Sequence, residues 1–277
     1  NIILISIINH LMTKLSIYCV TNKRIKFLEN YPYNLAWVGN QVAPINYLKC
    51  DDKKNIFFKE KYYSELTFHY WYWKNLINLE KNEWIGFCQK RRFWIKPNSK
   101  VSIINKDNIK EFLITEPLKD WKNYDSIICN PIKVSGVKKI KIIKRGWKNL
   151  IKDPMILFDK KKQNITLHFD MHHGYGNLDK AIEEVQEQDR NDFKKFVYEK
   201  DSFNPHIMFI SKVNILDKWF SILFAWLERC EKQFGFTELV GYDKTRLYAY
   251  LAERYLSFWF KKYSKHKEEN WVQLDNF

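Results

Sequence analysis

The sequence predicts an α/β protein with one main domain and a helical C-terminal part. Short apolar runs with the length of buried strands alternate with longer segments of helical periodicity. The chain has 277 residues, 45% of them hydrophobic, which is enough for one large core. No stretch is rich enough in Gly, Ser or Pro to divide domains. We therefore expect a single domain at residues 15–262, between an apolar extension at 1–14 and a polar, peripheral tail at 263–277.

The strands and helices follow from these patterns in chain order. The buried first strand at 15–20 ends in a loop at 21–23, and further apolar strands are expected at 84–88, 126–129 and 207–210. Helices are expected at 60–79, 107–119, 178–199, 214–233 and 243–262. In the third of these, Ile182, Val185, Phe193 and Phe196 fall near one face. Residues 133–163 are rich in lysine and form an irregular basic excursion from the core.

The first residues do not predict a membrane span. Residues 1–11 are apolar but too short to cross a bilayer, and they lack the basic region and the cleavage site of a signal peptide. Met12 is expected as a natural start, with the preceding residues as upstream read-through. Membrane contact by this segment is left open.

The net charge and the cysteine pattern limit the classes of function that are possible. The formal net charge is +15, which suits nucleic acid, an anionic membrane surface or a phosphorylated substrate. No helix-turn-helix, zinc finger or aromatic RNA-binding signature is present, so nucleic acid is not favoured. The five cysteines form no CxxC pair, which indicates free thiols in a reducing cytosol rather than a zinc or redox site.

Arg91 and Arg92 are the strongest functional signal, because they come shortly after the apolar strand at 84–88, at its carboxyl end. Open α/β sheets bind ligands at the carboxyl ends of their strands. An arginine fork makes strong, often bidentate hydrogen bonds to phosphate and stays charged at neutral pH. The pair therefore predicts a diphosphate clamp, whereas the ordinary alternative is a solvated basic turn.

Two segments, one acidic and one rich in histidine, could bind a metal ion or transfer a proton. Asp51 and Asp52 resemble a pair that holds Mg²⁺ or Mn²⁺, although adjacent acids in turns are common. Residues 168–179 hold three histidines and two aspartates, but their spacing matches no zinc signature. These histidines are expected in a loop before a helix that begins at Asn177, where free N–H groups would favour an anion.

Glu253 and Arg254 lie inside the last long helix, and an ion pair is their ordinary structural interpretation. His206 follows Asn204 and Pro205 just before the strand at 207–210. The sequence contains no GxSxG, P-loop or GxGxxG motif, so serine hydrolase, P-loop ATPase and classical dinucleotide-binding functions have no support.

Together these motifs resemble a bacterial family of capsular polysaccharide and O-antigen glycosyltransferases, formerly catalogued as a domain of unknown function. The resemblance extends from about residue 15 to 275 and has four parts: Ile17–Lys23; Asp52, Asn55 and Ile56 with Tyr63–Thr67, Tyr70, Trp71 and Trp73–Asn75; Ile85–Cys88 with Arg91–Phe93; and Arg246, Ala252–Arg254 and Trp259. Departures at Gln89, Asn177 and His206 put catalytic roles of these three residues in doubt.

The resemblance implies a GT-A-like, nucleotide-binding fold and transfer of a sugar from a nucleotide-diphosphate donor to a lipid-linked polysaccharide. It implies a UDP-sugar, with galactofuranose or another hexose, and a cytoplasmic protein peripheral on the inner face of the membrane, in contact with its anionic surface. A divalent cation, Mn²⁺ or Mg²⁺, is left open. Expected donor contacts are Thr21, Asn22, Asp52, Asn55, Glu65, Arg91 and Arg92. Candidate catalytic groups are His173, Asp179, Asp243 and Glu253, with His206 and Arg254 on the acceptor side.

Two other classes of function stay open at this point. One is a nucleic-acid-binding module that uses basic charge and aromatic side chains. The other is a non-catalytic glycan-binding partner in a polysaccharide assembly complex, which would bind glycan without consuming a donor.

Overall fold

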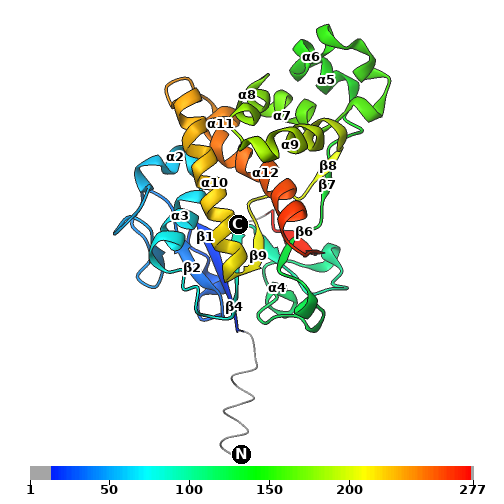
Figure 1. The fold of residues 1–277 in the computed structure, drawn as a ribbon. Coiled ribbons are helices and arrows are strands. Elements are labelled where there is room, and N and C mark those ends of the chain that lie inside the picture. The colour runs from blue at the N-terminus through cyan, green and yellow to red at the C-terminus, as the bar shows by residue number, and fades with distance from the viewer. Residues whose placement is uncertain (1–13, 276–277) are drawn as a thin grey trace, which may run out of the picture.

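The computed structural model describes residues 14–275, apart from the side chain of Tyr242, and a nine-stranded sheet forms its centre (Figure 1). The expected α/β class is confirmed. Of the expected extension at 1–14, residues 1–13 lie outside the described residues. The strands of the sheet are β1 (Lys14–Thr21), β2 (Asn34–Trp37), β3 (Leu48–Lys49), β4 (Glu83–Gln89), β5 (Arg92–Trp94), β6 (Ser126–Cys129), β9 (Phe209–Lys212), β10 (His266–Glu269) and β11 (Trp271–Gln273).

The strand directions bring several loops to one edge of the sheet. The order is β10-β6-β9-β4-β1-β2-β3, with β5 paired to β4 and β11 paired to β5. β1 runs parallel to β2 and β4, whereas β9 runs antiparallel between β4 and β6. The carboxyl ends of β1, β2, β4 and β6 therefore meet the beginning of β9 at the same edge, which is where such sheets bind ligands.

Helices make up most of the chain between residues 139 and 263, in keeping with the helical C-terminal part expected from the sequence. In Figure 1, α10 and α12 cross the sheet, α7, α8 and α9 lie beyond them, and α5 and α6 project at the far end. The helices are α2 (Glu60–Tyr63), α3 (Leu66–Asn75), α4 (Ile109–Phe112), α5 (Lys139–Arg145), α6 (Trp147–Lys152), α7 (Ile165–His173), α8 (Asn177–Glu183), α9 (Glu187–Glu199), α10 (Val213–Phe234), α11 (Tyr242–Thr245) and α12 (Leu247–Tyr263).

Smaller elements connect these parts. β7 (Ile132–Lys133) and β8 (Ser202–Phe203) form a two-stranded antiparallel sheet at the two ends of the segment that carries α5 to α9. The 3-10 helices are η1 (Lys26–Leu28), η2 (Phe57–Lys59), η3 (Val101–Ile103), η4 (Lys119–Asn123), η5 (Pro154–Leu157) and η6 (Lys160–Lys162).

Both faces of the sheet are buried, which explains why its strands read as almost continuous apolar runs. In β4, Ile85 and Phe87 belong to the core that includes side chains of α3, α10 and α12. Trp84 and Cys88 alternate with them and belong to a second core on the other face.

Gly86 in β4 fits where a larger residue would not. A Cβ atom at this position would lie 2.8 Å from Cγ1 of Ile210 and 3.1 Å from Cγ1 of Ile17. We expect Gly86→Ala to lower the free energy of unfolding by about 1–3 kcal/mol, because these buried neighbours must move. Urea denaturation measures this loss. Unchanged stability would mean that the two isoleucines shift freely.

Several expected helices differ from the structure. The helix expected at 60–79 is divided at Ser64, whose φ of 51° ends α2, and α3 ends at Asn75. The helix expected at 178–199 is divided between α8 and α9, and 107–119 is helical over α4 alone. The histidines at 168, 172 and 173 lie on α7 and not in a loop. Local periodicity does not distinguish one helix from two that pack on the same core.

The tail expected at 263–277 is not peripheral. Residues 266–269 form β10 beside β6, and residues 271–273 form β11 beside β5. Val272 is buried, and Trp271 packs at the edge of the ring of His206 with centroids 4.6 Å apart. β10 and β11 are too short to show a clear alternation of apolar and polar residues. Pairing with β6 and β5 stabilises them more than burial of their own side chains does, so the sequence alone does not predict them.

Candidate functional site

A cluster of charged side chains occupies the edge where β1 and β4 end. Thr21 closes a turn with Lys23, and Lys90 Nζ donates to Asn22 Oδ1 at 2.5 Å. Burial lowers the pKa of Lys90, nearby Glu65 opposes that shift, and Arg246 adds to it. Burial raises the pKa of Glu60, and Arg246 opposes that shift. Arg246, at the start of α12, therefore faces the same edge as the loops after β1 and β4.

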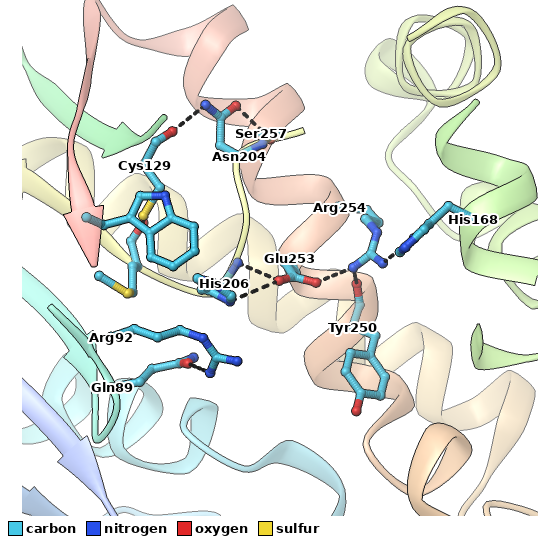
Figure 2. A network of polar contacts seen from close by, with 12 residues as sticks. Gln89, Arg92, Cys129, His168, Asn204, His206, Tyr250, Glu253, Arg254 and Ser257 are labelled. Atoms are coloured by element: carbon cyan, nitrogen blue, oxygen red, sulfur yellow. Dashed lines mark hydrogen bonds and ion pairs between the residues drawn. The ribbon is translucent and has the colours of Figure 1, made fainter. Parts of the chain in front are cut away.

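The two arginines extend this cluster toward β9. Arg91 lies in the turn after β4, and Arg92 begins β5. Arg92 Nη1 donates to Gln89 Oε1 at 2.8 Å (Figure 2). The Nε of Arg91 is buried without a hydrogen-bond partner among residues 14–275. Both arginines are intermediate in exposure and lie at this edge of the sheet.

His206 connects the arginines to α12. Its backbone N–H donates to Glu253, and its Nδ1 lies 3.7 Å from Glu253 Oε1 (Figure 2). Its φ of 65° is unusual for a residue other than glycine. Burial, with Arg92 and Arg254 close by, lowers the pKa of His206 to about 2. The ring is therefore neutral at physiological pH.

Arg254 is a fully buried cation on α12. It pairs with Glu253, and its guanidinium lies 4.2 Å from the ring centre of Phe203. Its Nη2 lies 3.3 Å from His168 Nδ1 and 3.5 Å from His173 Nε2. Because arginine only donates, both ring nitrogens must act as acceptors, which requires neutral histidines. The other nitrogen of His173, Nδ1, then donates to the carbonyl of Asp243 at 3.0 Å.

The neutral histidines make the fold sensitive to acid. Burial lowers the pKa of His69 to about 3, and burial together with Arg254 lowers those of His168 and His173 to about 2. The unfolded chain, with histidine pKa values near 6.5, binds protons that the folded chain does not. Stability is therefore fully present above pH 6.5 and falls as the pH decreases below it.

We expect the free energy of unfolding to fall between pH 7 and pH 5 by up to about 1.4 kcal/mol per pH unit for each buried histidine. Urea denaturation across this range measures the slope. His168→Asn, which removes one of these histidines, should make the slope shallower than in the unmodified protein. A flat profile in both proteins would show that these histidines are protonated in the folded state.

An aromatic ring lies beside the cations. Tyr250 stacks on His173 with ring centroids 3.7 Å apart. In Figure 2, Tyr250 and Glu253 of α12 lie on one side of the drawn network, and Arg92 and Gln89 lie on the other. A flat apolar face near charged donors is common in sites that bind sugars or bases.

A small cavity lies at the end of β2. It has a volume of about 230 Å³, and Trp37, Gly39 and Phe57 are among its lining residues. A Cβ atom at Gly39 would lie 3.0 Å from Cβ of Asn22, so the loop after β2 packs closely on the loop after β1. Trp37 Nε1 donates to the carbonyls of Gly39 and Gln41 at 3.1 and 3.0 Å, which fixes this loop.

The structure brings together most of the residues predicted from sequence. Those at or beside the described edge are Thr21, Asn22, Glu65, Arg91, Arg92, His173, His206, Glu253 and Arg254. Asp52 and Asn55 lie on the loop after β3, where Asp52 accepts a hydrogen bond from Trp71 Nε1 at 2.7 Å. Asn55 Nδ2 donates to two backbone carbonyls of the same loop.

Two candidate carboxylates lie elsewhere. Asp179 accepts a hydrogen bond from the hydroxyl of Tyr198 at 2.7 Å and lines a separate cavity of about 350 Å³ beside η6. Asp243 pairs with Arg145 at 3.4 Å. Glu253 is therefore the candidate carboxylate that contacts His206, in the segment that leads into β9.

The residues from 14 to 275 contain no group of three His, Cys, Asp or Glu side chains arranged to hold a metal ion. Asp51 and Asp52 are exposed, and the space between His168 and His173 is taken by the Arg254 guanidinium. A cation would be repelled from the histidine cluster for that reason.

Three residues at the site were not predicted from sequence as site residues: Lys90, Arg246 and Tyr250. Lys90 adjoins the arginine pair, and Arg246 and Tyr250 lie close to Glu253 in the chain. Arg246 and Tyr250 reach the site because α12 packs on the sheet, which no local sequence pattern reveals.

Comparisons with known proteins identify a family and a shared fold. A family model described as "Domain of unknown function (DUF4422)" matches residues 16–266. No curated protein matches the chain. The apo structure of WbbM, a bifunctional glycosyltransferase, superposes with a TM-score of 0.72 at 20% sequence identity. The match covers 95% of this chain and 46% of the WbbM chain. This chain therefore spans about half the length of WbbM and shares the WbbM fold over that part.

Proposed function

Because the chain belongs to the DUF4422 family, and its fold is shared with a bifunctional glycosyltransferase, we propose that it is itself a glycosyltransferase that uses a nucleotide-diphosphate sugar. The observation that carries the proposal is the concentration of Lys90, Arg91, Arg92 and Arg246 at the carboxyl edge of the sheet. A bound diphosphate would neutralise these cations, which otherwise repel one another.

The donor would lie along this edge. The diphosphate would contact the two arginines and Lys90, which offer charged donors at short range. The loop at Thr21 and Asn22 would hold the nucleoside, with the cavity at Trp37 large enough for part of a base. We propose UDP as the nucleotide, and galactofuranose or another hexose as the sugar, in keeping with the sequence resemblance.

The reaction breaks the bond between the anomeric carbon and a diphosphate oxygen, and it forms a bond from that carbon to an acceptor hydroxyl oxygen. Negative charge grows on the leaving diphosphate, and Arg91 and Arg92 would stabilise it. The hydroxyl proton must leave with a base. If the reaction inverts configuration, Glu253 would take that proton, since its carboxylate lies beside His206 at the acceptor side.

The acceptor would approach from α12. Tyr250 offers a ring for sugar stacking, while His206 and Arg254 position Glu253. We propose a lipid-linked capsular or O-antigen polysaccharide as acceptor, and peripheral contact with the anionic inner face of the cytoplasmic membrane. Both follow from the sequence resemblance and the basic charge of the chain.

A thermal-shift screen tests the donor site. The protein is heated with UDP, GDP, CMP or dTDP, each with and without Mn²⁺. A ligand that binds only the folded state stabilises it by about 2.7 kcal/mol at one hundred times its dissociation constant. We expect UDP to raise the melting temperature more than the others do, and the Mn²⁺ arm to report whether a cation contributes.

The control for this screen is Lys195→Ala, an exposed lysine on α9, which should keep the shift. Lys90→Met should lose most of it. If no nucleotide raises the melting temperature of the unmodified protein, the proposed donor site is refuted. Salt-sensitive binding of RNA or DNA would then favour a nucleic-acid-binding module, and binding of glycan alone would favour a non-catalytic partner.

A further inference from the structure

Residues 138–162, which we call the basic projection, expose an unusual number of apolar side chains. This segment contains α5, α6, η5 and η6 and lies at one end of the molecule (Figure 1). Six of its large hydrophobic side chains are between 51% and 73% exposed: Ile140, Ile143, Trp147, Ile151, Met155 and Phe158. Exposed apolar side chains gathered in one segment mark an interaction surface.

Positive charge surrounds these side chains. The basic projection holds ten lysines and arginines against two aspartates, which is a large share of the net charge of the whole chain. Lys139 lies 4.9 Å from the ring centre of Phe158, and Lys148 lies 5.6 Å from that of Trp147. The cations are therefore interleaved with the apolar groups and do not form a separate patch.

The exposed side chains are not needed to hold the projection together. Ile142 and Ile156 are buried with Leu167 and Met171 of α7 in a small core of their own. Ile140 and Ile143 lie on the same short helix as Ile142 but point to solvent. α5 is thus anchored by the buried Ile142, and α6 packs on the same core through the partly buried Leu150, while both helices expose apolar and basic side chains.

We propose that the basic projection docks on the surface of an anionic lipid bilayer. Lysines interleaved with Ile, Trp and Phe are the composition of segments that lie in the membrane interface, where apolar groups enter the acyl boundary and cations meet anionic headgroups. Among the described residues, no helix is long and apolar enough to cross a membrane. Single-stranded nucleic acid would instead require stacked aromatic rings, whereas four of the six exposed groups here are aliphatic.

The position of the projection fits the proposed function, on which this step rests. Arg145, at the end of α5, lies 3.0 Å from His172 Nδ1 and contacts Asp243. His168 and His173 of the same helix, α7, contact Arg254. A bilayer beneath the projection would therefore lie one helix away from the acceptor side of the site, where a lipid-linked sugar could reach it.

Vesicle co-sedimentation of the full chain tests the docking surface. Phosphatidylcholine vesicles are compared with vesicles that also contain phosphatidylglycerol. We expect binding to the anionic vesicles and its loss at high salt. Lys144→Glu combined with Lys148→Glu should weaken binding about thirtyfold or more, since each cation near an anionic surface raises the membrane affinity several-fold. Ile143→Ser combined with Ile151→Ser should weaken it about tenfold or more.

Matched controls come from η3 and its flanks, which precede α4 at the other end of the molecule (Figure 1). Lys100→Glu with Lys106→Glu makes the same change of net charge, and Val101→Ser with Ile103→Ser removes similarly exposed apolar groups. Circular dichroism confirms folding of each variant. Both control variants should bind anionic vesicles almost as the unmodified protein does.

Three results would overturn the proposal: no binding to anionic vesicles, equal losses in the control variants, or unchanged binding in the projection variants. Attachment to cell membranes without binding to pure lipid would mean that the projection contacts a protein partner. Vesicle binding requires no donor, so its failure is distinguishable from a failure of the nucleotide screen, which tests the proposed function alone.

Discussion

Replacing Arg91 by Ala should reduce sugar transfer by about a hundredfold to a thousandfold while leaving the fold intact. The side chain lies in the turn between β4 and β5, and its Nε has no hydrogen-bond partner among the described residues. Its backbone carbonyl, which accepts from the N–H of Leu274 at 2.8 Å, is unaffected by the substitution. The loss should therefore fall on stabilisation of the leaving diphosphate.

The measurement is release of nucleoside diphosphate from the donor identified by the thermal-shift screen. Arg91→Lys should be intermediate, because lysine keeps the charge but not the bidentate fork. Arg190→Ala on α9 serves as control, since that arginine lies outside the site and contacts Glu183 at 4.0 Å. Full activity of Arg91→Ala, with an unchanged melting temperature, would remove Arg91 from the clamp.

The sequence predicts the centre of the sheet well, because these strands are buried on both faces. The strand at 126–129 coincides with β6, and the strand at 84–88 lies within β4. Apart from Ser126, each run is apolar, and a short apolar run of this length is typical of a strand that is buried on both faces. By contrast, β2 was not predicted, and β10 and β11 lie in a segment expected to be a polar tail. β10 and β11 are stabilised by β6 and β5, their partners distant in sequence.

Site residues at the ends of strands can be predicted from sequence, whereas those brought to the site by helix packing cannot. Arg91 and Arg92 come in the turn after β4 and at the start of β5, so their place at the carboxyl edge can be inferred from local sequence. Arg246 and Tyr250 reach the site because α12 packs over the sheet, more than 150 residues further along the chain. Asp179, close in sequence to the histidines, instead pairs with Tyr198 because α8 turns away after Gly176.

The second large effect concerns the buried pair of Arg254 and Glu253. Arg254→Met should lower the free energy of unfolding by about 3–5 kcal/mol, because it leaves Glu253 in a partly buried position without its cation. Lys232→Met, which breaks an exposed pair with Glu228 on α10, should cost less than about 1 kcal/mol. Urea denaturation at pH 7 compares the two variants.

A double variant separates the pair from the packing of Arg254 on Phe203. If the unpaired carboxylate causes the loss, Glu253→Gln combined with Arg254→Met should be more stable than Arg254→Met alone. Removing Arg254 should also raise the pKa values of His168 and His173, since its charge helps to lower them. The double variant should then lose less stability between pH 7 and pH 5 than the unmodified protein. An equal loss would show that burial alone keeps these histidines neutral, and that Arg254 holds Glu253 without governing the protonation of the rings beside it.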